Sequence, residues 1–375
     1  MSSTQNKLNG RERVARAFRR EPIDRVPRLE NPWVDTIRAW QQQGHLPADS
    51  LDAGFTAFAN FFEYDFQRLT FYWPQPFPGH NELIEETDTY RRIRNPFGSV
   101  TREWKHHSGV PGHDAWECDG PDIWKEKYLP AFSCQEPQIN IGDMRRNMER
   151  AEKAGRWRNI AMAEIFEVLR QMIGDEAFMI NTIEEPGWIA EMAETIIDTI
   201  LRNLEWALQK GIRPDGLWVY GDMAFKTGPF CSPASYKELI QPAHKRLVDW
   251  AHARDLKVIY HTDGDFRLCI DPLMRAGFDA FHPLECNAGM QVAELAPHIG
   301  DRVLLIGNVS APVLERGDPD EVEAEMLAKL RAGMEHHCYV YQSDHSVSPQ
   351  VSWDTIVQVK CLLDTAGRYE QAFDG

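Results

Sequence analysis

Short apolar runs alternate with amphipathic segments along most of the chain, and this alternation predicts its main elements. The unit formed by residues 257–290 shows the pattern clearly. Val258–Tyr260 is an apolar run typical of a buried strand, residues 268–276 place their apolar positions on one helical face, and Asp279–Phe281 predicts a second strand. Gly277 suits the left-handed residue that commonly ends a helix. The pattern therefore predicts a strand, a helix and a second strand.

The same alternation recurs from about residue 140 onward. Further strands are predicted at Asn159–Ala163, Gly216–Tyr220, Val303–Ile306 and Tyr339–Gln342, after an early strand that ends near Glu30. Helices are predicted at Ile183–Lys210, Ser235–Arg254 and Pro319–Ala332. Seven or eight strands separated by helices indicate an α/β protein with a (β/α)8 TIM-type barrel. An open sheet is less favoured, because no Gly-x-Gly-x-x-Gly turn follows an early strand.

Residues 82–107 change to a short alternation of period two around Asn95-Pro96-Phe97-Gly98, which is typical of a β-hairpin. We therefore predict one barrel domain over residues 1–375, with a β-hairpin-rich insertion at about residues 71–132 that covers one mouth of the barrel. Residues 51–64 are rich in aromatic side chains. These side chains predict either core packing beneath a helix or a wall for a planar ligand.

The net charge of the 375 residues is −16, which argues against nucleic acid or an anionic membrane surface as a partner. No apolar run approaches the roughly 20 residues of a membrane span, and Met1–Gly10 is polar, so we expect a cytoplasmic protein. The seven cysteines include no Cys-x-x-Cys pair, which predicts reduced thiols rather than a disulfide framework.

Polar side chains follow the predicted strands, and in a barrel they converge on the mouth at the carboxyl ends of the strands. In chain order they are Glu164, Asp222, His261, Asp263, Glu285, Asn308 and His345. Two histidines with several carboxylates suit a divalent cation such as zinc, or a general acid and base pair, and the residues leave both open. The alternative, without a functional role, is that a strand-end histidine is structural and that Asp263 only caps the following helix.

Several motifs occur in an order that carries a family resemblance. They are RERVARAFRREPIDRVP, GPFCSPASYKELIQPAHKRLVDWAHARDLKVIYHTDGD, AGFDAFHPLECNAGM, RVLLIGNVSAPVLERGDPDEV and SDHSVSPQVSWDTI. With these motifs the chain resembles the uroporphyrinogen decarboxylase superfamily, which includes corrinoid-dependent methyltransferases. True decarboxylases of that family carry a paired arginine motif near the N-terminus that holds the carboxylates of the tetrapyrrole. The matching stretch, RVPRLENPWVDTI, offers Arg25 and Arg28 but lacks that motif, so the methyltransferase branch is favoured.

The resemblance also implies a site. Methyltransferases of this branch bind zinc through a His-x-Cys motif and a later Cys; here His261 keeps the histidine, Asp263 replaces the cysteine, and His345 lies near the last ligand position. The expected metal ligands are His261, Asp263, Glu285 and His345. The expected catalytic residues are Asp222, His261, Glu285 and His345, and the expected substrate-binding residues are Glu164, Tyr220, Phe225 and Asn308.

The function implied by the resemblance is transfer of a methyl group between a small methylated substrate, of the methoxy-aromatic or methylamine type, and a corrinoid. Zinc is the expected cofactor. The corrinoid would be a co-substrate, cobalamin-like and carried on a separate protein, and a homodimer is left open. The alternatives are a decarboxylase of a tetrapyrrole or another carboxylate, which would use an acid and base without metal, and a non-catalytic barrel that binds a corrinoid or tetrapyrrole.

Overall fold

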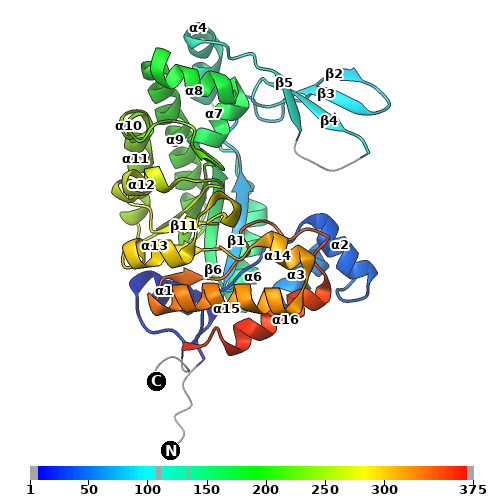
Figure 1. Ribbon diagram of the computed structural model, residues 1–375. Helices are drawn as coiled ribbons and strands as arrows, with labels where there is room; N and C mark the ends of the chain where they lie inside the picture. The colour runs from blue at the N-terminus through cyan, green and yellow to red at the C-terminus, as the bar shows by residue number, and fades with distance from the viewer. Residues whose placement is uncertain (1–6, 107–110, 134–135, 370–375) are drawn as a thin grey trace, which may run out of the picture.

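The computed structural model describes residues 7–106, 111–133 and 136–369, and a curled parallel sheet forms its centre (Figure 1). Its strand order is β1-β6-β7-β10-β11-β12-β13, with every neighbouring pair parallel. The strands are β1 (Phe66–Tyr72), β6 (Trp157–Ala163), β7 (Gly216–Tyr220), β10 (Lys257–His261), β11 (Ala280–His282), β12 (Leu304–Ile306) and β13 (Tyr339–Val340). Helices separate successive strands, so the (β/α)8 prediction is confirmed.

A short segment around Arg28 occupies the eighth position of the barrel. On one side it pairs with the end of β13: Leu29 N–H donates to Tyr341 O (3.2 Å) and Tyr341 N–H to Pro27 O (2.9 Å). On the other side one main-chain hydrogen bond joins it to the residue before β1, from Asp65 N–H to Arg28 O (2.9 Å). Beyond this bond, toward the carboxyl ends of the strands, the described main chain forms no ladder of hydrogen bonds between the segment and β1. We call this gap in the strand pairing the seam.

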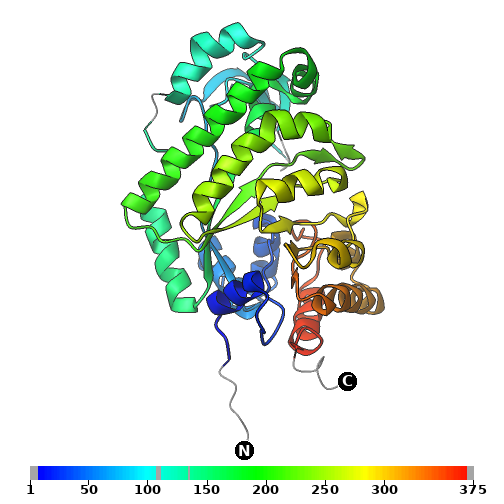
Figure 2. The same cartoon turned by 90° about the vertical axis from the view of Figure 1, so that its left-hand side faces the viewer.

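Helices cover the outside of the sheet, and Figure 2 shows α9 and α11 side by side across one face. The helices on either side of the early strand and the insertion are α1 (Gly10–Arg19), α2 (Val34–Gln42), α3 (Leu51–Phe61), α4 (Pro121–Ile123), α5 (Leu129–Ser133) and α6 (Ile141–Ala154). Those of the central barrel are α7 (Ile165–Ile173), α8 (Asp175–Glu184), α9 (Pro186–Gln209), α10 (Pro233–Ser235), α11 (Gln241–His252) and α12 (Ile270–Ala276). The last are α13 (Val292–Ile299), α14 (Ala311–Arg316), α15 (Pro319–Glu335) and α16 (Trp353–Thr365).

The amino-terminal end of the barrel is closed by an apolar plug. Val14 and Ala17 on α1 are buried there against side chains that point inward from the strands. Those inward side chains are Phe66, Trp157, Ala161, Trp218, Ile259, Ala280, Leu304, Ile306 and Val340. Because successive strand residues point to opposite faces, the next inward layers carry Arg68, Asn159, Tyr220, His261 and His282. The polar layers therefore face the opposite, carboxyl end.

The arginines of the amino-terminal segment are used inside the fold. Asp65, which is 1% exposed, accepts hydrogen bonds from Arg13 Nη1 (2.5 Å), Arg25 Nη1 (2.7 Å) and the main-chain N–H of Arg28 (2.8 Å). The Arg28 guanidinium is fully buried and pairs with Glu63 and with Asp364 (2.7 Å). Arg25 and Arg28 are therefore held by carboxylates of the protein itself, and the sequence-based view that they are available to a substrate is wrong.

A separate antiparallel sheet lies in the region of the predicted insertion and projects beyond the end of β1 (Figure 1). Its strands are β2 (Glu82–Glu86), β3 (Tyr90–Arg94), β4 (Val100–Trp104) and β5 (Gly112–Ala115). Its last strand reaches α7, where the His113 ring contacts Gln171 Oε1 (2.9 Å). None of the described residues of this sheet lines the cavity at the barrel mouth, and a role of the insertion as a cover of the mouth stays a prediction.

Two further predictions concern membrane-spanning segments and disulfide bonds. No described helix is both long and apolar enough to cross a membrane. The six described cysteines are free thiols, and Cys134 lies outside the described residues.

Candidate functional site

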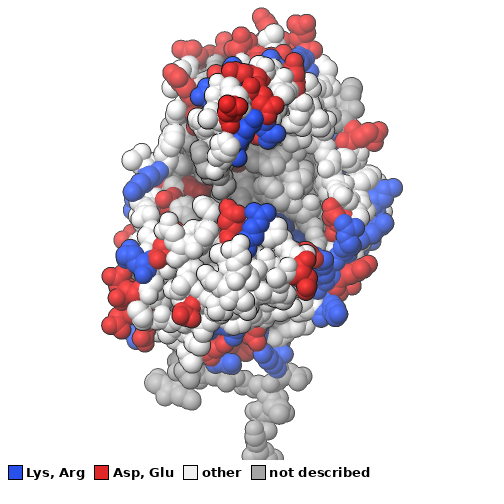
Figure 3. Space-filling view, turned by 90° about the vertical axis from the view of Figure 1, so that its right-hand side faces the viewer, with Lys and Arg blue, Asp and Glu red and all other residues white. Residues whose placement is uncertain are grey.

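A cavity of about 900 Å³ opens at the carboxyl ends of the strands. Its inner part is lined by Tyr220, His261, Asp263, His282 and His345, and it continues past the seam to α3 and α6. Figure 3 shows the molecular surface hollowed between the insertion at the top and the body below it. Predicted strand-end residues thus meet at one mouth, as expected for a TIM-type barrel.

His261 is the centre of a polar chain across this mouth. Its Nδ1 lies 2.6 Å from Nδ1 of His282, and Nε2 of His282 lies 3.0 Å from Oε1 of Gln342. The amide oxygen of Gln342 only accepts, so His282 carries its proton on Nε2 and accepts at Nδ1 from His261. The Tyr220 ring packs on His261, with centroids 4.3 Å apart. His282 therefore fixes the orientation of His261 and leaves His261 Nε2 as the atom that faces the site.

Two carboxylates lie next to that nitrogen. His261 Nε2 is 3.2 Å from Asp222 Oδ1, and ligand atoms of Asp222, His261 and Asp263 all lie within 4.8 Å of one another. Asp222 Oδ1 also accepts from the main-chain N–H of Asp263 (3.1 Å). Asp263 Oδ1 is buried and has no hydrogen-bond partner among the described residues. An unpaired buried oxygen beside an imidazole nitrogen and a second carboxylate fits a divalent cation.

The charges of this triad depend on one another. Burial alone would lower the pKa of His261, but the carboxylates of Asp222 and Asp263 outweigh it and raise that pKa. Burial alone would raise the pKa of Asp222, but the charge and hydrogen bond of His261 lower it to about 2. Burial, with the nearby charge of Asp222, raises the pKa of Asp263. In the absence of metal, a proton on His261 thus compensates the two carboxylates, and a bound cation would take over that role.

The other two predicted ligands form a neighbouring pair. His345 Nε2 lies 3.6 Å from Glu285 Oε1, and Glu285 Oε2 accepts from the main-chain N–H of Gly264 (2.8 Å). Gly264 follows Asp263 directly, so this pair sits against the triad without belonging to it. His345 is 42% exposed in its side chain, whereas Glu285 is 14% exposed. His345 is therefore the group of the pair that solvent or a substrate reaches first.

Two of the predicted substrate-binding residues point away from the cavity. Glu164 is fully buried, where it accepts from the main-chain N–H of Ile165 (2.5 Å) and from Tyr260 (3.3 Å) and pairs with His244 (2.6 Å). Asn308 is also fully buried; its Oδ1 accepts from Val292 N–H (2.8 Å) and its Nδ2 donates to main-chain carbonyls. Both side chains have all their polar atoms engaged in holding loops and helix ends.

The remaining two substrate-binding candidates differ from each other. Tyr220 lines the cavity beside His261. Phe225 is 45% exposed and packs on Phe230, with ring centroids 4.1 Å apart, and it does not line the cavity. The aromatic run after residue 51 is divided as well, because Phe58 and Phe62 belong to the core whereas Phe55 and Tyr64 line the cavity.

Sequence reasoning missed two carboxyl groups near the mouth. Glu30 lines the cavity at the end of the eighth-position segment and is 4% exposed; burial raises its pKa to about 7 although Ser343, Tyr341 and the Asn31 N–H donate to it. Burial and the charge of Asp222 raise the pKa of Glu167, on α7, to about 8. Glu30 could have been found from the sequence, because a predicted strand ends there. Glu167 does not lie at a predicted strand end, so the sequence contains no comparable sign of it.

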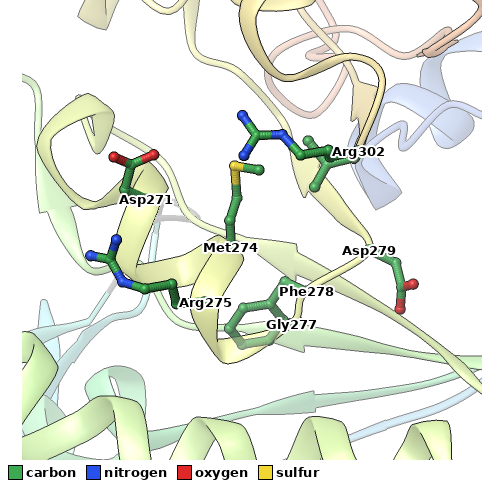
Figure 4. Close-up of a pocket in the computed structure, with 8 residues that line it drawn as sticks. Asp271, Met274, Arg275, Gly277, Phe278, Asp279 and Arg302 are labelled. Carbon is green, nitrogen blue, oxygen red and sulfur yellow. The ribbon is translucent and has the colours of Figure 1, made fainter.

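A second cavity, of about 490 Å³, lies at the opposite end of the strands (Figure 4). It is lined by Asp271, Met274, Arg275, Gly277, Phe278, Asp279, Arg302 and Val303. Asp279 accepts there from Lys257 Nζ (2.7 Å) and from the main-chain N–H of Val258 (2.8 Å). These contacts fasten the start of the strands, so this cavity is not the candidate site.

Comparisons with known proteins identify the family and the fold. A protein-family model described as uroporphyrinogen decarboxylase (URO-D) matches residues 162–369, which is more than half of the chain. The methylcobamide:CoM methyltransferase MtaA of Methanosarcina barkeri (strain Fusaro / DSM 804) is 22% identical over 227 residues, which cover 54% of this chain and 64% of the relative. A second M. barkeri protein of the same name is 21% identical over 224 residues. These matches span less than two thirds of the length of either relative.

Among solved structures, a methyltransferase from Methanosarcina mazei superposes with a TM-score of 0.65 at 15% sequence identity. The superposition covers 95% of this chain and 98% of that chain. At this identity the likeness establishes the fold.

Proposed function

The chain belongs to the uroporphyrinogen decarboxylase family, and within that family we propose that it acts as a metal-dependent methyltransferase. The reaction would move a methyl group from a small methylated substrate to the cobalt of a reduced corrinoid carried by a separate protein. The bond between the methyl carbon and its heteroatom breaks, the heteroatom keeps the electron pair, and the cobalt supplies the pair that forms the new bond to carbon. The names of the curated relatives support this class of reaction.

The observation that carries the proposal is the triad of Asp222, His261 and Asp263 with the unpaired oxygen of Asp263. These residues would hold the metal, and a divalent cation there would act as a Lewis acid that stabilises charge on the departing heteroatom. Nitrogen and oxygen ligands of this kind suit zinc and favour an ether or alcohol oxygen over a thiol. We propose zinc as the resident metal.

The chain's own residues would supply orientation and protons. His282 accepts from His261 Nδ1, which keeps His261 Nε2 directed at the site. The Tyr220 ring packs on His261 and borders the cavity, where it would limit the position of a substrate. His345 is partly exposed beside Glu285 and is suited to pass a proton to the departing oxygen. Glu285 would orient that imidazole.

Decarboxylation of a tetrapyrrole is the weaker alternative. Arg25 and Arg28 are buried in ion pairs with Asp65, Glu63 and Asp364, so they cannot clamp the carboxylates of such a substrate. Bringing each unpaired carboxylate into a closed site would cost on the order of several kcal/mol. We therefore expect no turnover of uroporphyrinogen.

The test combines metal analysis with a transfer assay. Purified protein should contain close to one zinc per chain by plasma emission, and His261→Ala should lose it while keeping its circular dichroism spectrum. His298→Ala, an exposed histidine on α13, is the matched control and should retain the metal. Anaerobic incubation of the wild type with cob(I)alamin and methoxylated compounds should give the absorbance change of methylcobalamin. Full metal retention in His261→Ala, or turnover of uroporphyrinogen without methyl transfer, would overturn the proposal.

A further inference from the structure

The cavity that holds the triad also carries positive charge at its other end. Arg68 on β1, Lys153 on α6 and Arg156 just before β6 all line it. In the described parts of the chain, none of these three side chains forms an ion pair with a carboxylate. Arg68 and Lys153 are exposed, whereas Arg156 is buried, so this end of the cavity is positively charged although the net charge of the protein is −16.

Arg156 is the most constrained of the three. It is only 7% exposed, and its guanidinium donates to two amide oxygens, Asn60 Oδ1 (2.8 Å) and Gln67 Oε1 (3.3 Å). It also lies over the Tyr64 ring, 5.9 Å from the centroid. Amide oxygens and a ring fix the guanidinium without neutralising it. The nearby Asp65 carboxylate acts on the charge of Arg156 without forming an ion pair with it, because Asp65 is bonded to Arg13 and Arg25. A buried cation is costly unless an anion pairs with it directly, which here points to an anion from outside the chain.

Arg68 connects that end of the cavity to the triad. It lies opposite Asn159 in the register of β1 and β6, and both residues line the cavity. Its charge acts on the Tyr220 hydroxyl, where it opposes the rise in pKa that burial causes. Since Tyr220 packs on His261, the cationic end and the candidate metal site belong to one continuous space.

The carboxylates of the same cavity do not supply the missing anion. Asp52 is held by Arg150 in a two-bonded ion pair (2.7 and 2.8 Å). Asp344 is fully buried and accepts from the main-chain N–H groups of Cys286 (3.0 Å) and Ala311 (2.8 Å). Glu30 is occupied by its own donors. The cavity is therefore anionic at the triad and cationic toward α6.

The lining of the same cavity is also aromatic: Phe55 and Tyr64 line it, and Phe66 and Trp218 of the apolar plug border it from below. Flat aromatic walls with a few polar groups at the ends suit a planar ligand oriented by its polar substituents.

From this arrangement we propose that the substrate is a small aromatic carboxylate that bears its methyl ether at the end remote from the carboxylate. The proposal rests on the proposed function for the identity of the reacting group, and on the cavity alone for the carboxylate. Arg68 and Arg156 would bind the carboxylate, Lys153 would add charge at the outer rim, and the ether would face His261 and Asp263. A methylammonium substrate is disfavoured, because the same cations repel it.

Binding of probes without a methyl group tests the carboxylate site separately from methyl transfer. We would titrate the metal-loaded protein with benzoate, its uncharged analogue benzamide, and acetate, by calorimetry. Benzoate should bind at least tenfold more tightly than benzamide or acetate. Arg68→Gln and Arg156→Gln should each weaken benzoate binding at least tenfold and leave benzamide binding unchanged. Arg146→Gln, an exposed arginine on the same helix as Lys153, is the matched control and should bind benzoate as the wild type does.

Equal binding of benzoate and benzamide, or wild-type benzoate affinity in both variants, would overturn the proposal, as would preferential binding of trimethylamine. If Arg156→Gln does not fold, the exposed Arg68 still provides the comparison. Benzoate binding without any methyl transfer would contradict the proposed function but not the carboxylate site. Transfer from anisole as fast as from 4-methoxybenzoate, with no selective benzoate binding, would contradict the carboxylate site alone.

Discussion

Replacing Glu30 with Gln should change how the stability of the protein depends on pH. The Glu30 carboxyl group is buried, and burial raises its pKa from the ordinary 4.5 to about 7. In the unfolded chain the group returns to its ordinary pKa. The folded protein therefore binds the Glu30 proton more tightly than the unfolded chain does, and this contributes stability that is fully present below pH 4.5 and is lost as the pH rises through about 7.

The size of the effect follows from the two pKa values. One unit of pKa difference corresponds to about 1.4 kcal/mol. The change from 4.5 to about 7 therefore corresponds to about 3 kcal/mol of unfolding free energy, lost between those pH values. Gln is uncharged throughout this range. Its amide has one acceptor oxygen for the donors from Ser343, Tyr341 and Asn31, so Glu30→Gln should be less stable than the wild type at low pH. The contribution of Gln at position 30 to the free energy of unfolding does not itself depend on pH.

Urea unfolding followed by tryptophan fluorescence at several pH values between 4.5 and 7.5 measures the difference. The free energy of unfolding of the wild type, relative to Glu30→Gln, should fall by about 3 kcal/mol across the range. Glu323→Gln, an exposed position on α15, serves as the control, and its profile should run parallel to that of the wild type. Parallel profiles for Glu30→Gln and the wild type would refute the reasoning, because Glu30 would then be ionised at little cost in the folded state.

Two further substitutions probe the fold and the site. Asp65→Asn should lower the free energy of unfolding by about 3–5 kcal/mol, because it leaves the buried Arg25, and part of Arg13, without an anion; a loss below 1 kcal/mol in urea titrations would contradict the structure. His282→Phe should raise the dissociation constant for zinc about 10–100-fold by removing the acceptor for His261 Nδ1, and a chelator-competition titration with unchanged affinity would show that His282 does not orient His261.

The barrel could be predicted because its strands are apolar runs, and in this architecture such runs mark strands buried on both faces. The prediction that His261 and Asp263 meet at the mouth follows from the same rule, since strand ends converge wherever a barrel closes. The structure brings these two residues together with Asp222, as the strand-end argument expects. Their role as metal ligands stays a prediction.

Other features depended on partners that are remote in sequence. Glu164 lies at a strand end like His261, but His244, which lies 80 residues away on α11, pairs with it inside the protein. The environment of Glu30 depends on Ser343, more than 300 residues away. Arg25 is unavailable to a substrate because it is paired with Asp65, a carboxylate that no sequence motif marks. Local patterns contain no information on such pairings, so burial and charge compensation appeared only in the fold.

The seam has a consequence for how the barrel holds its shape. Elsewhere neighbouring strands are joined by ladders of peptide hydrogen bonds, but here a single one, from Asp65 N–H to Arg28 O, crosses the wall. The Asp65 carboxylate completes the junction by binding the Arg28 N–H and the guanidinium of Arg25. At the seam, the interactions of the Asp65 carboxylate therefore hold the barrel closed in place of a ladder of main-chain hydrogen bonds. Such a junction can open locally while the remaining strands stay folded. This local opening would widen the cavity between β1 and the segment around Arg28, rather than at the carboxyl ends of the strands.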